Sequence, residues 1–392
     1  MAAPPFDAAH LDRLMDEAGL DVLLATSKHN VQYLLGGHRA LFFDYMDAIG
    51  VSRYLPAFVY PKGQPERAAY IGHRIEGHQV QVTPLWPNTV QTKSWGATDC
   101  IEKAMAHVHA QALPAGRIGV EMAFLPAASA EALRGAAPNA MVIDAAPVLD
   151  RLRACKNEHE LELLREASER VIDSMLAVLA SHGPGSTKHE MAEALRREET
   201  DRGMQFEYCL IAAGSSHNRA PSDQHWEKGD VLSLDSGGNY QGYIGDIARM
   251  AILGSPDSEL EDALAEIEMV QRAAFAPVRA GVLGGEIYAG AEAALKKCKF
   301  KPIEFVAHGM GLATHEVPHL TSKGPTPYPD DDARAPLQPG MVLSVETTLM
   351  HPKRGFIKLE DTVAVTKAGF EVFADRARGW NRGAERAARA AE

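Results

Sequence analysis

The sequence predicts a mixed α/β (α+β) protein of two domains, and three observations lead to this prediction. The length of 392 residues exceeds the usual size of a single hydrophobic core. Strand and helix patterns alternate up to about Asp150, and a long helix pattern then opens a second region rich in apolar strand patterns. With 46% apolar and 23% charged residues, the composition is that of a globular protein. We therefore expect domains at residues 1–150 and 151–392.

The first domain should be a small α/β unit. Leu11, Leu14, Met15 and Ala18 repeat at helical spacing, and Gly19 is a typical helix stop. A buried strand at 21–26 and a short helix at 30–36 follow. Further strands are expected near 55–61, 69–72 and 117–121, and further helices near 99–112 and 127–135.

The second domain should begin with a long amphipathic helix that runs from Arg151 to about His182 and links the two domains from about Lys156. A stop and a new start follow, with Ser186 or Thr187 as the N-cap and Glu190 near a capping-box position. Two helix–turn–helix pairs are expected, at about 160–202 and 258–297. Each pair precedes a stretch rich in strand patterns.

Five possible metal ligands follow one another in this second domain, each within or at the end of an apolar strand pattern: Asp235, Asp246, His308, Glu346 and Glu360. Taken singly, each residue is more often a turn, cap or structural residue than a ligand. Their order and spacing together favour a metal site, since facing buried carboxylates stay ionised only beside a cation. Four carboxylates and one imidazole suit Mn²⁺, Co²⁺, Fe²⁺ or Zn²⁺, and the sequence predicts a dinuclear centre.

The order of these residues and the local motifs, such as His-Gly-Met-Gly after position 307, resemble the metallopeptidase family of aminopeptidase P, prolidase and methionine aminopeptidase. That family also contains creatinase. The resemblance implies a pita-bread catalytic domain over roughly residues 157–375, in which the two helix pairs mark an internal pseudo-repeat. It also implies a smaller creatinase/prolidase-type domain over residues 1–150.

The resemblance further implies roles for single residues. Asp246 and Glu360 would bridge two divalent ions, with Asp235 on one ion and His308 and Glu346 on the other. Mn²⁺ or Co²⁺ is expected first, with Zn²⁺ or Fe²⁺ as alternatives. A metal-bridging hydroxide would attack the substrate, and Glu346 would carry the proton. His315, seven residues after His308, matches the family's substrate-binding histidine.

Three departures from the family pattern concern the substrate. Asn218 stands where the family has a histidine and is expected to contact the substrate, whereas His217, one residue earlier, is the candidate to replace that histidine as a catalytic residue. Lys358 is expected to contact the substrate, but it replaces a common arginine and lacks the fork that binds a carboxylate at two points. Thr347 replaces a common proline.

An aromatic and basic cluster at residues 38–54 offers Arg39 or Arg53 as the missing contact for a substrate carboxylate. The resemblance implies that such a loop reaches the active site of a neighbouring subunit. We therefore expect a homodimer.

These observations predict a metal-dependent hydrolase that resembles Xaa-Pro dipeptidases and cleaves a dipeptide or another small-molecule amide. One alternative is a non-peptidase C–N hydrolase of the same family, creatinase-like or ectoine-hydrolase-like. A C–S lyase and a non-enzymatic binding module are further alternatives. The complete ligand set disfavours both the metal-free creatinase mechanism and the binding module.

Charge and cysteine usage exclude other classes. The formal net charge of −12, from 40 basic and 52 acidic residues, disfavours nucleic acid and anionic membranes as partners. Cys100, Cys155, Cys209 and Cys298 are scattered and form no Cys-x-x-Cys pair, which favours reduced thiols. Neither a signal peptide nor an apolar run of about 18 residues is present. The expected location is therefore cytoplasmic.

Overall fold

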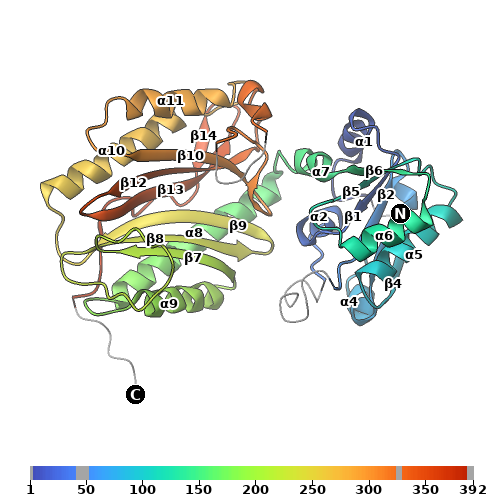
Figure 1. Cartoon of the computed structure of the whole chain (residues 1–392), viewed down its shortest axis with the longest axis horizontal. Helices are drawn as coiled ribbons and strands as arrows, with labels where there is room; N and C mark the ends of the chain where they lie inside the picture. The colour runs from blue at the N-terminus through green and yellow to red at the C-terminus, as the bar shows by residue number, and fades with distance from the viewer. Residues whose placement is uncertain (1–2, 41–52, 324–328, 386–392) are drawn as a thin grey trace, which may run out of the picture. The chain divides into compact units, whose positions relative to one another are not determined.

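The computed structural model describes residues 3–40, 53–323 and 329–385, and it divides the chain into two compact units (Figure 1). The units span Met1–Arg153 and Ala154–Glu392, so the division falls a few residues after the boundary that the sequence predicts. Each unit is built on one β-sheet, and the helices of each unit pack on its own sheet.

The first unit contains a sheet of six strands in the order β4-β3-β2-β1-β5-β6. Strand β2 is antiparallel to both of its neighbours, and the other pairs are parallel. The strands are β1 (Val22–Ala25), β2 (Ala57–Pro61), β3 (Ala69–His73), β4 (Thr89–Ser94), β5 (Arg117–Val120) and β6 (Met141–Asp144). The helices are α1 (Ala8–Glu17), α2 (Lys28–Leu34), α4 (Gly77–Val82), α5 (Ala97–Ala110), α6 (Ala127–Ala136) and α7 (Ala146–Leu152), with 3₁₀ turns η2 (Pro65–Arg67) and η3 (Arg74–Glu76).

Helices cover both faces of this sheet. On β1, Leu23 belongs to the same buried cluster as Leu11 of α1, whereas its neighbour Leu24 belongs to a second cluster with Met105 of α5. Successive side chains of a strand point to opposite faces, so a strand that is apolar at every position must be buried on both.

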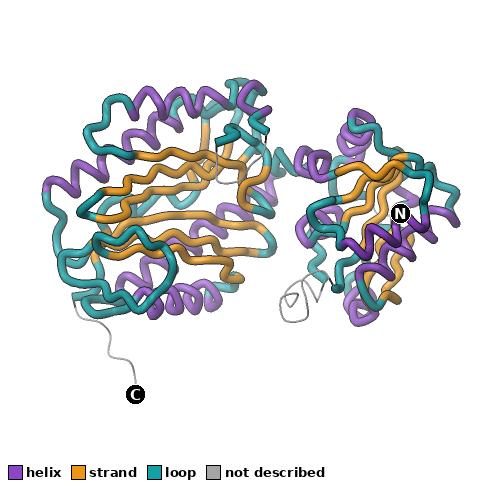
Figure 2. Tube along the Cα trace, viewed as in Figure 1, coloured by secondary structure: helices purple, strands orange, loops and turns teal. Residues whose placement is uncertain are grey.

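The second unit contains one curved sheet in the order β11-β10-β12-β13-β9-β8-β7, with β14 beside β13 and β15 beside β9 (Figure 2). The strands are β7 (Gln205–Ala213), β8 (Val231–Tyr240), β9 (Tyr243–Ile252), β10 (Ile303–Met310), β11 (Thr314–Glu316), β12 (Val342–His351), β13 (Gly355–Val365), β14 (Phe370–Val372) and β15 (Asn381–Arg382). The helices are α8 (Glu158–Ser181), α9 (Lys188–Asp201), α10 (Ser258–Phe275) and α11 (Gly285–Leu295), with the 3₁₀ turn η4 (Asp331–Arg334). A helix pair followed by strands occurs twice, which confirms the predicted pita-bread architecture. No helix in the described ranges is long and apolar enough to cross a membrane.

The predicted long helix from Arg151 is wrong at its start. Helix α7 ends at Leu152, and α8 begins only at Glu158. The side chain of Asn157 accepts a hydrogen bond from the backbone N–H of Glu160, and the carboxylate of Glu160 accepts one from the backbone N–H of Asn157. This capping box fixes the new start. The next helix start is as predicted, because Thr187 and Glu190 form the capping box of α9.

Alternation along the strands sorts side chains between the two faces of the second sheet. Leu232 and Leu234 of β8 pack in the core beneath α8 and α9, so Asp235 points to the opposite face. Likewise, Leu343 and Val345 of β12 pack beneath α10 and α11. The helices therefore cover one face, and the face opposite them carries the acidic residues.

We predict that Gly245→Ala destabilises the second unit. A Cβ at Gly245 in β9 would lie 2.6 Å from backbone atoms of Ala167 and Ser168 in α8. Relieving this clash would require the strand or the helix backbone to move. The expected loss is about 1–3 kcal/mol of unfolding free energy, measured by chemical denaturation. Gly369→Ala is the control, because a Cβ there meets no atom within 4 Å. Equal stability of the two variants would contradict this packing.

A second prediction concerns Glu199 of α9, whose carboxyl is buried 2.9 Å from Ser236 Oγ. Burial raises its pKa to about 8 from a usual value near 4.5. Between these values the folded chain holds a proton that the unfolded chain has lost, so stability falls as pH rises. Relative to Glu199→Gln, the wild type should lose on the order of 2–3 kcal/mol between pH 5.5 and 8. Denaturation at both pH values checks this, and a pH-independent difference would refute it.

Candidate metal centre

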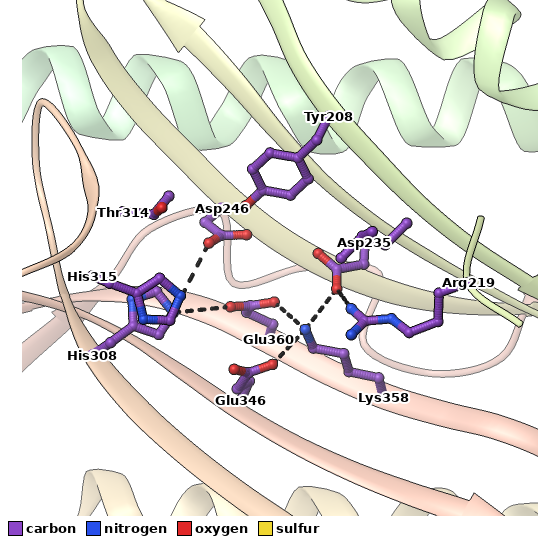
Figure 3. Close-up of a pocket in the computed structure, with 11 residues that line it drawn as sticks. Tyr208, Arg219, Asp235, Asp246, His308, Thr314, His315, Glu346, Lys358 and Glu360 are labelled. Atoms are coloured by element: carbon purple, nitrogen blue, oxygen red, sulfur yellow. Dashed lines mark hydrogen bonds and ion pairs between the residues drawn. The ribbon is translucent and has the colours of Figure 1, made fainter. Parts of the chain in front are cut away.

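The five predicted ligands lie on five adjacent strands, one residue on each strand. They are His308 on β10, Glu346 on β12, Glu360 on β13, Asp246 on β9 and Asp235 on β8. Glu346 is the direct cross-strand partner of Glu360, and Ala248 pairs with both Glu360 and Asp235. This register brings all five side chains to one pocket with a volume of about 300 Å³ (Figure 3).

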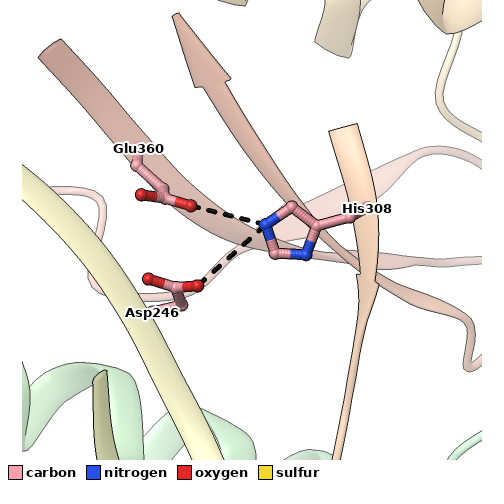
Figure 4. A group of neighbouring side chains, drawn as sticks. All are labelled: Asp246, His308 and Glu360. Atoms are coloured by element: carbon pink, nitrogen blue, oxygen red, sulfur yellow. Dashed lines mark ion pairs between the residues drawn. The ribbon is translucent and has the colours of Figure 1, made fainter. Parts of the chain in front are cut away.

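Asp246, His308 and Glu360 form the tightest group in this pocket (Figure 4). One ligand atom from each lies within 4.8 Å of the others. His308 Nε2 is 3.6 Å from Glu360 Oε1 and 4.0 Å from Asp246 Oδ2. The Nδ1–H of His308 donates to the carbonyl oxygen of Gly309 at 3.3 Å, which orients Nε2 toward the acids.

These three residues fit a divalent cation. Oδ1 of Asp246 is buried and has no hydrogen-bond partner among the described residues, so a carboxylate oxygen is available there. Burial, with Glu360 and Asp235 nearby, raises the pKa of Asp246 well above its usual range. A cation would reverse this shift and keep Asp246 ionised. One nitrogen and several carboxylate oxygens suit the first-row divalent metals.

The other acids of the pocket differ in their electrostatic setting. Burial and the charge of Glu360 raise the pKa of Glu346. Burial opposes the ionisation of Glu360, but Lys358 and His308 outweigh it and lower the pKa of Glu360 below its usual range. Glu360 is thus the acid most firmly held as a carboxylate, and Ser344 Oγ donates to its Oε1 at 2.8 Å.

Lys358 lies among these acids. Its side chain is 3% exposed, and Nζ is 2.6 Å from Asp235 Oδ2, 2.5 Å from Glu346 Oε2 and 2.7 Å from Glu360 Oε2. Burial opposes its charge, but the three carboxylates raise the pKa of Lys358 well above its usual range. Arg219 adds a second ion pair to Asp235 Oδ2.

His315 lies against the ligand His308. The two rings stack with centroids 3.9 Å apart and planes 18° apart. His315 has φ of +59°, a left-handed conformation that is costly for a residue with a Cβ. Burial and the neighbouring His308 lower the pKa of His315 to about 4, so its ring is neutral near pH 7. Its buried Nδ1 has no hydrogen-bond partner within the described ranges.

The remaining predicted site residues lie elsewhere. His217 and Asn218 are exposed in the loop after β7 and do not line the pocket. His217 Nε2 donates to the carbonyl oxygen of His351 at 3.1 Å, and Asn218 Oδ1 accepts from the N–H of Ala220 at 3.1 Å. Arg39 belongs to the first unit, where Nη1 donates to Gln32 at 3.2 Å. Most of the 38–54 cluster, residues 41–52, lies outside the described residues.

Sequence reasoning missed three polar residues that line the pocket: Tyr208, Arg219 and Thr314. Arg219 directly follows Asn218, in the loop that differs from the family pattern, and this difference could have drawn attention to Arg219. Thr314 precedes His315, and Tyr208 lies in β7 opposite the β8 strand that carries Asp235.

Comparisons with known proteins agree with this geometry. The Creatinase/Prolidase N-terminal domain matches residues 8–155, and Metallopeptidase family M24 matches residues 162–367. The chain is 24% identical over 365 residues to the Xaa-Pro dipeptidase of Pyrococcus horikoshii, covering 91% of this chain and 93% of that one. It is 30% identical to the probable dipeptidase PepE of Mycobacterium tuberculosis over 57% of this chain and 60% of that one.

A solved structure shares the fold over nearly the whole length. The Xaa-Pro dipeptidase of Bacillus anthracis superposes with a TM-score of 0.80 at 23% identity, over 96% of this chain and 98% of that one. The M24 match spans more than half of the 392 residues and contains all five predicted ligands. The chain therefore belongs to metallopeptidase family M24.

Proposed function

We propose that this protein is a metal-dependent dipeptidase that cleaves Xaa-Pro dipeptides. The observation that carries the proposal is the buried group of Asp246, His308 and Glu360 at the pocket, in a chain whose relatives include proteins named Xaa-Pro dipeptidase. A divalent ion held by these residues supplies Lewis acidity, which polarises a carbonyl group and acidifies water. Mn²⁺ and Co²⁺ remain the ions we predict.

Glu346 is the proposed proton carrier. Its side chain is 17% exposed, compared with 2% for Glu360, so it is the more accessible of this carboxylate pair. Burial and Glu360 raise its pKa, which favours an acid that can accept a proton from water and release it to the leaving nitrogen. Its cross-strand pairing with Glu360 holds it beside the metal ligands.

His315 is the proposed contact for the substrate carbonyl group. It lines the pocket, and its ring is neutral near pH 7, so one ring nitrogen carries a proton to donate. Stacking on His308 keeps the ring beside the metal ligands. The left-handed backbone at this position supports a functional role, since such strain persists where the surroundings enforce it.

Arg219 is the proposed contact for the substrate carboxylate. The ammonium of Lys358 has three donors and three carboxylate neighbours, whereas Arg219 has five donors and one carboxylate partner among the described residues. The Arg219 side chain is 32% exposed, lines the pocket and lies over the Phe356 ring at 4.9 Å. A guanidinium in this position suits a terminal carboxylate.

The pocket favours a small substrate. Its volume of about 300 Å³ is at the lower end of ligand pockets, which typically span roughly 300–1,000 Å³. A dipeptide suits this volume better than a long peptide does. Roles for Asn218 and Arg39 in binding it, and a catalytic role for His217, remain predictions.

We further propose that the protein is a cytoplasmic homodimer. The four cysteines are free, and burial raises the pKa of the Cys100 thiol to about 12, which supports structural reduced thiols. The dimer is proposed from the sequence alone, because the basic and aromatic residues at 38–54, most of which lie outside the described residues, offer contacts for a neighbouring subunit. Light scattering would measure the assembly state.

We predict that Asp246→Asn abolishes metal binding and activity. The substitution removes a charged ligand from the group of three and leaves a neutral amide in its place. Mass spectrometry of the metal content after gel filtration should find less than a tenth of the wild-type amount. Glu199→Gln is the matched control, since it also converts a buried acid to an amide but lies outside the pocket. Full metal content in Asp246→Asn would refute the assignment.

We predict that Arg219→Gln raises KM for Xaa-Pro dipeptides about 10- to 150-fold, because one charge-assisted contact contributes on the order of 1.5–3 kcal/mol. The matched control is the Xaa-Pro amide, which lacks the carboxylate and should show a much smaller change in KM. An equal rise in KM for both substrates would show that Arg219 only forms the ion pair with Asp235 and does not bind the substrate carboxylate.

A substrate panel tests the proposed activity itself. It should contain Xaa-Pro dipeptides, longer Xaa-Pro peptides, creatine and ectoine, each assayed with Mn²⁺, Co²⁺ and Zn²⁺. Dipeptides should be turned over fastest. Turnover of creatine or ectoine together with no cleavage of any peptide would replace the proposal with a non-peptidase C–N hydrolase.

A further inference from the structure

The pocket contains two groups of carboxylate oxygens that could each surround a cation, and Glu360 belongs to both. Its Oε1 faces His308 Nε2 at 3.6 Å, and its Oε2 faces Lys358 Nζ at 2.7 Å (Figures 3 and 4). The first position is bounded by Asp246, His308 and Glu360. The second is surrounded by oxygens of Asp235, Glu346 and Glu360, and the ammonium of Lys358 fills it.

The contacts of Lys358 are those of a cation in a ligand cage. Three carboxylate oxygens lie 2.5–2.7 Å from Nζ, which is the range of charge-assisted hydrogen bonds. A divalent first-row ion would draw the same oxygens to roughly 2.0–2.2 Å. Because Nζ already contacts all three oxygens, an ion cannot share this position with the ammonium.

Charge balance gives the same result. The pocket has four negative charges when its acids are ionised, namely Asp235, Asp246, Glu346 and Glu360. Lys358 and Arg219 contribute two positive charges. One divalent ion beside a neutral His308 brings the cluster to zero. A second divalent ion would leave two uncompensated positive charges in a buried site, next to an ammonium, which is unfavourable.

We propose that this active site holds one divalent ion, at Asp246, His308 and Glu360, and that the ammonium of Lys358 takes the place of a second ion. Asp235 and Glu346 are then partners of Lys358 rather than obligatory metal ligands. This differs from the sequence prediction of two ions. The inference rests on the proposed metal-dependent function but is tested by metal content, so failure of the substrate assay and failure of this inference are separate results.

The first test uses Asp235→Asn, with Asp246→Asn as its counterpart. After loading with Mn²⁺ and gel filtration, the wild type should retain about one ion per chain by mass spectrometry. Asp235→Asn should also retain about one, with a dissociation constant within about threefold of the wild type, whereas Asp246→Asn should retain none. Two tightly held ions in the wild type, with one lost in Asp235→Asn, would overturn the proposal.

Spectroscopy of the Mn²⁺-loaded wild type provides an independent readout. A single ion gives the six-line electron paramagnetic resonance signal of isolated Mn²⁺, and this signal is expected at all loadings up to saturation. An exchange-coupled multiline spectrum that grows with loading would show two neighbouring ions and would overturn the proposal.

The second test uses Lys358→Ala, which opens the position that the ammonium fills. The metal content should rise from about one to about two ions per chain. Lys156→Ala is the matched control, because Lys156 is also buried and paired with an acid, Glu316 at 2.7 Å, but does not line the pocket. A folded Lys358→Ala protein that still holds one ion would overturn the role of Lys358. If Lys358→Ala does not fold, Asp235→Asn and the spectrum still decide the question.

Discussion

The centre of the second unit depends on the neutralisation of four neighbouring carboxylates, of which three are buried and one, Glu346, is 17% exposed. Asp235, Asp246, Glu346 and Glu360 lie on one face of a sheet where water is largely excluded, and ionised groups there require positive partners. The chain supplies part of this charge itself through Lys358 and Arg219. The carboxylate that most needs a further positive partner is Asp246. Its Oδ1 has no hydrogen-bond partner within the described ranges, and its pKa is raised by burial and by its acidic neighbours.

The geometry of the sheet explains why these charges can be assembled at all. Each of the five site residues comes from a different strand. The alternate side chains of these strands, such as Leu232, Leu234, Leu343 and Val345, pack in the helix-covered core. Apolar burial on one face thus stabilises the strands that hold the acids on the other. Close helix packing adds to this rigidity, because Gly245 lets α8 approach the strand that carries Asp246.

Sequence reasoning predicted much of this arrangement and failed where local pattern carries little information. The helix pairs and the five ligand strands were predictable, since their apolar periodicity is strong and the acids interrupt it at fixed positions. Strands β4 and β6 were missed because they form the sheet edges, and Thr89–Ser94 is largely polar. The helix start at Glu158 was misplaced because the pattern continues across Asn157, whose capping role depends on a single side-chain contact. Arg219 was missed because contact with Asp235 depends on how a loop folds back, which spacing does not encode.

The structure gives Lys358 a different role from the one that the sequence suggested. From the sequence, the replacement of a common arginine by lysine predicted weaker binding of a substrate carboxylate. In the structure it meets three carboxylates of the pocket, and the chemistry of the two side chains explains the difference. A guanidinium is a planar fork suited to one carboxylate approached edge-on, whereas an ammonium is a compact charge whose three donors diverge. Only the ammonium matches a cage of three oxygens from β8, β12 and β13. With Lys358 held by three carboxylates, Arg219 is the side chain that we propose for carboxylate recognition, and Lys358 places a positive charge among the acids of the pocket.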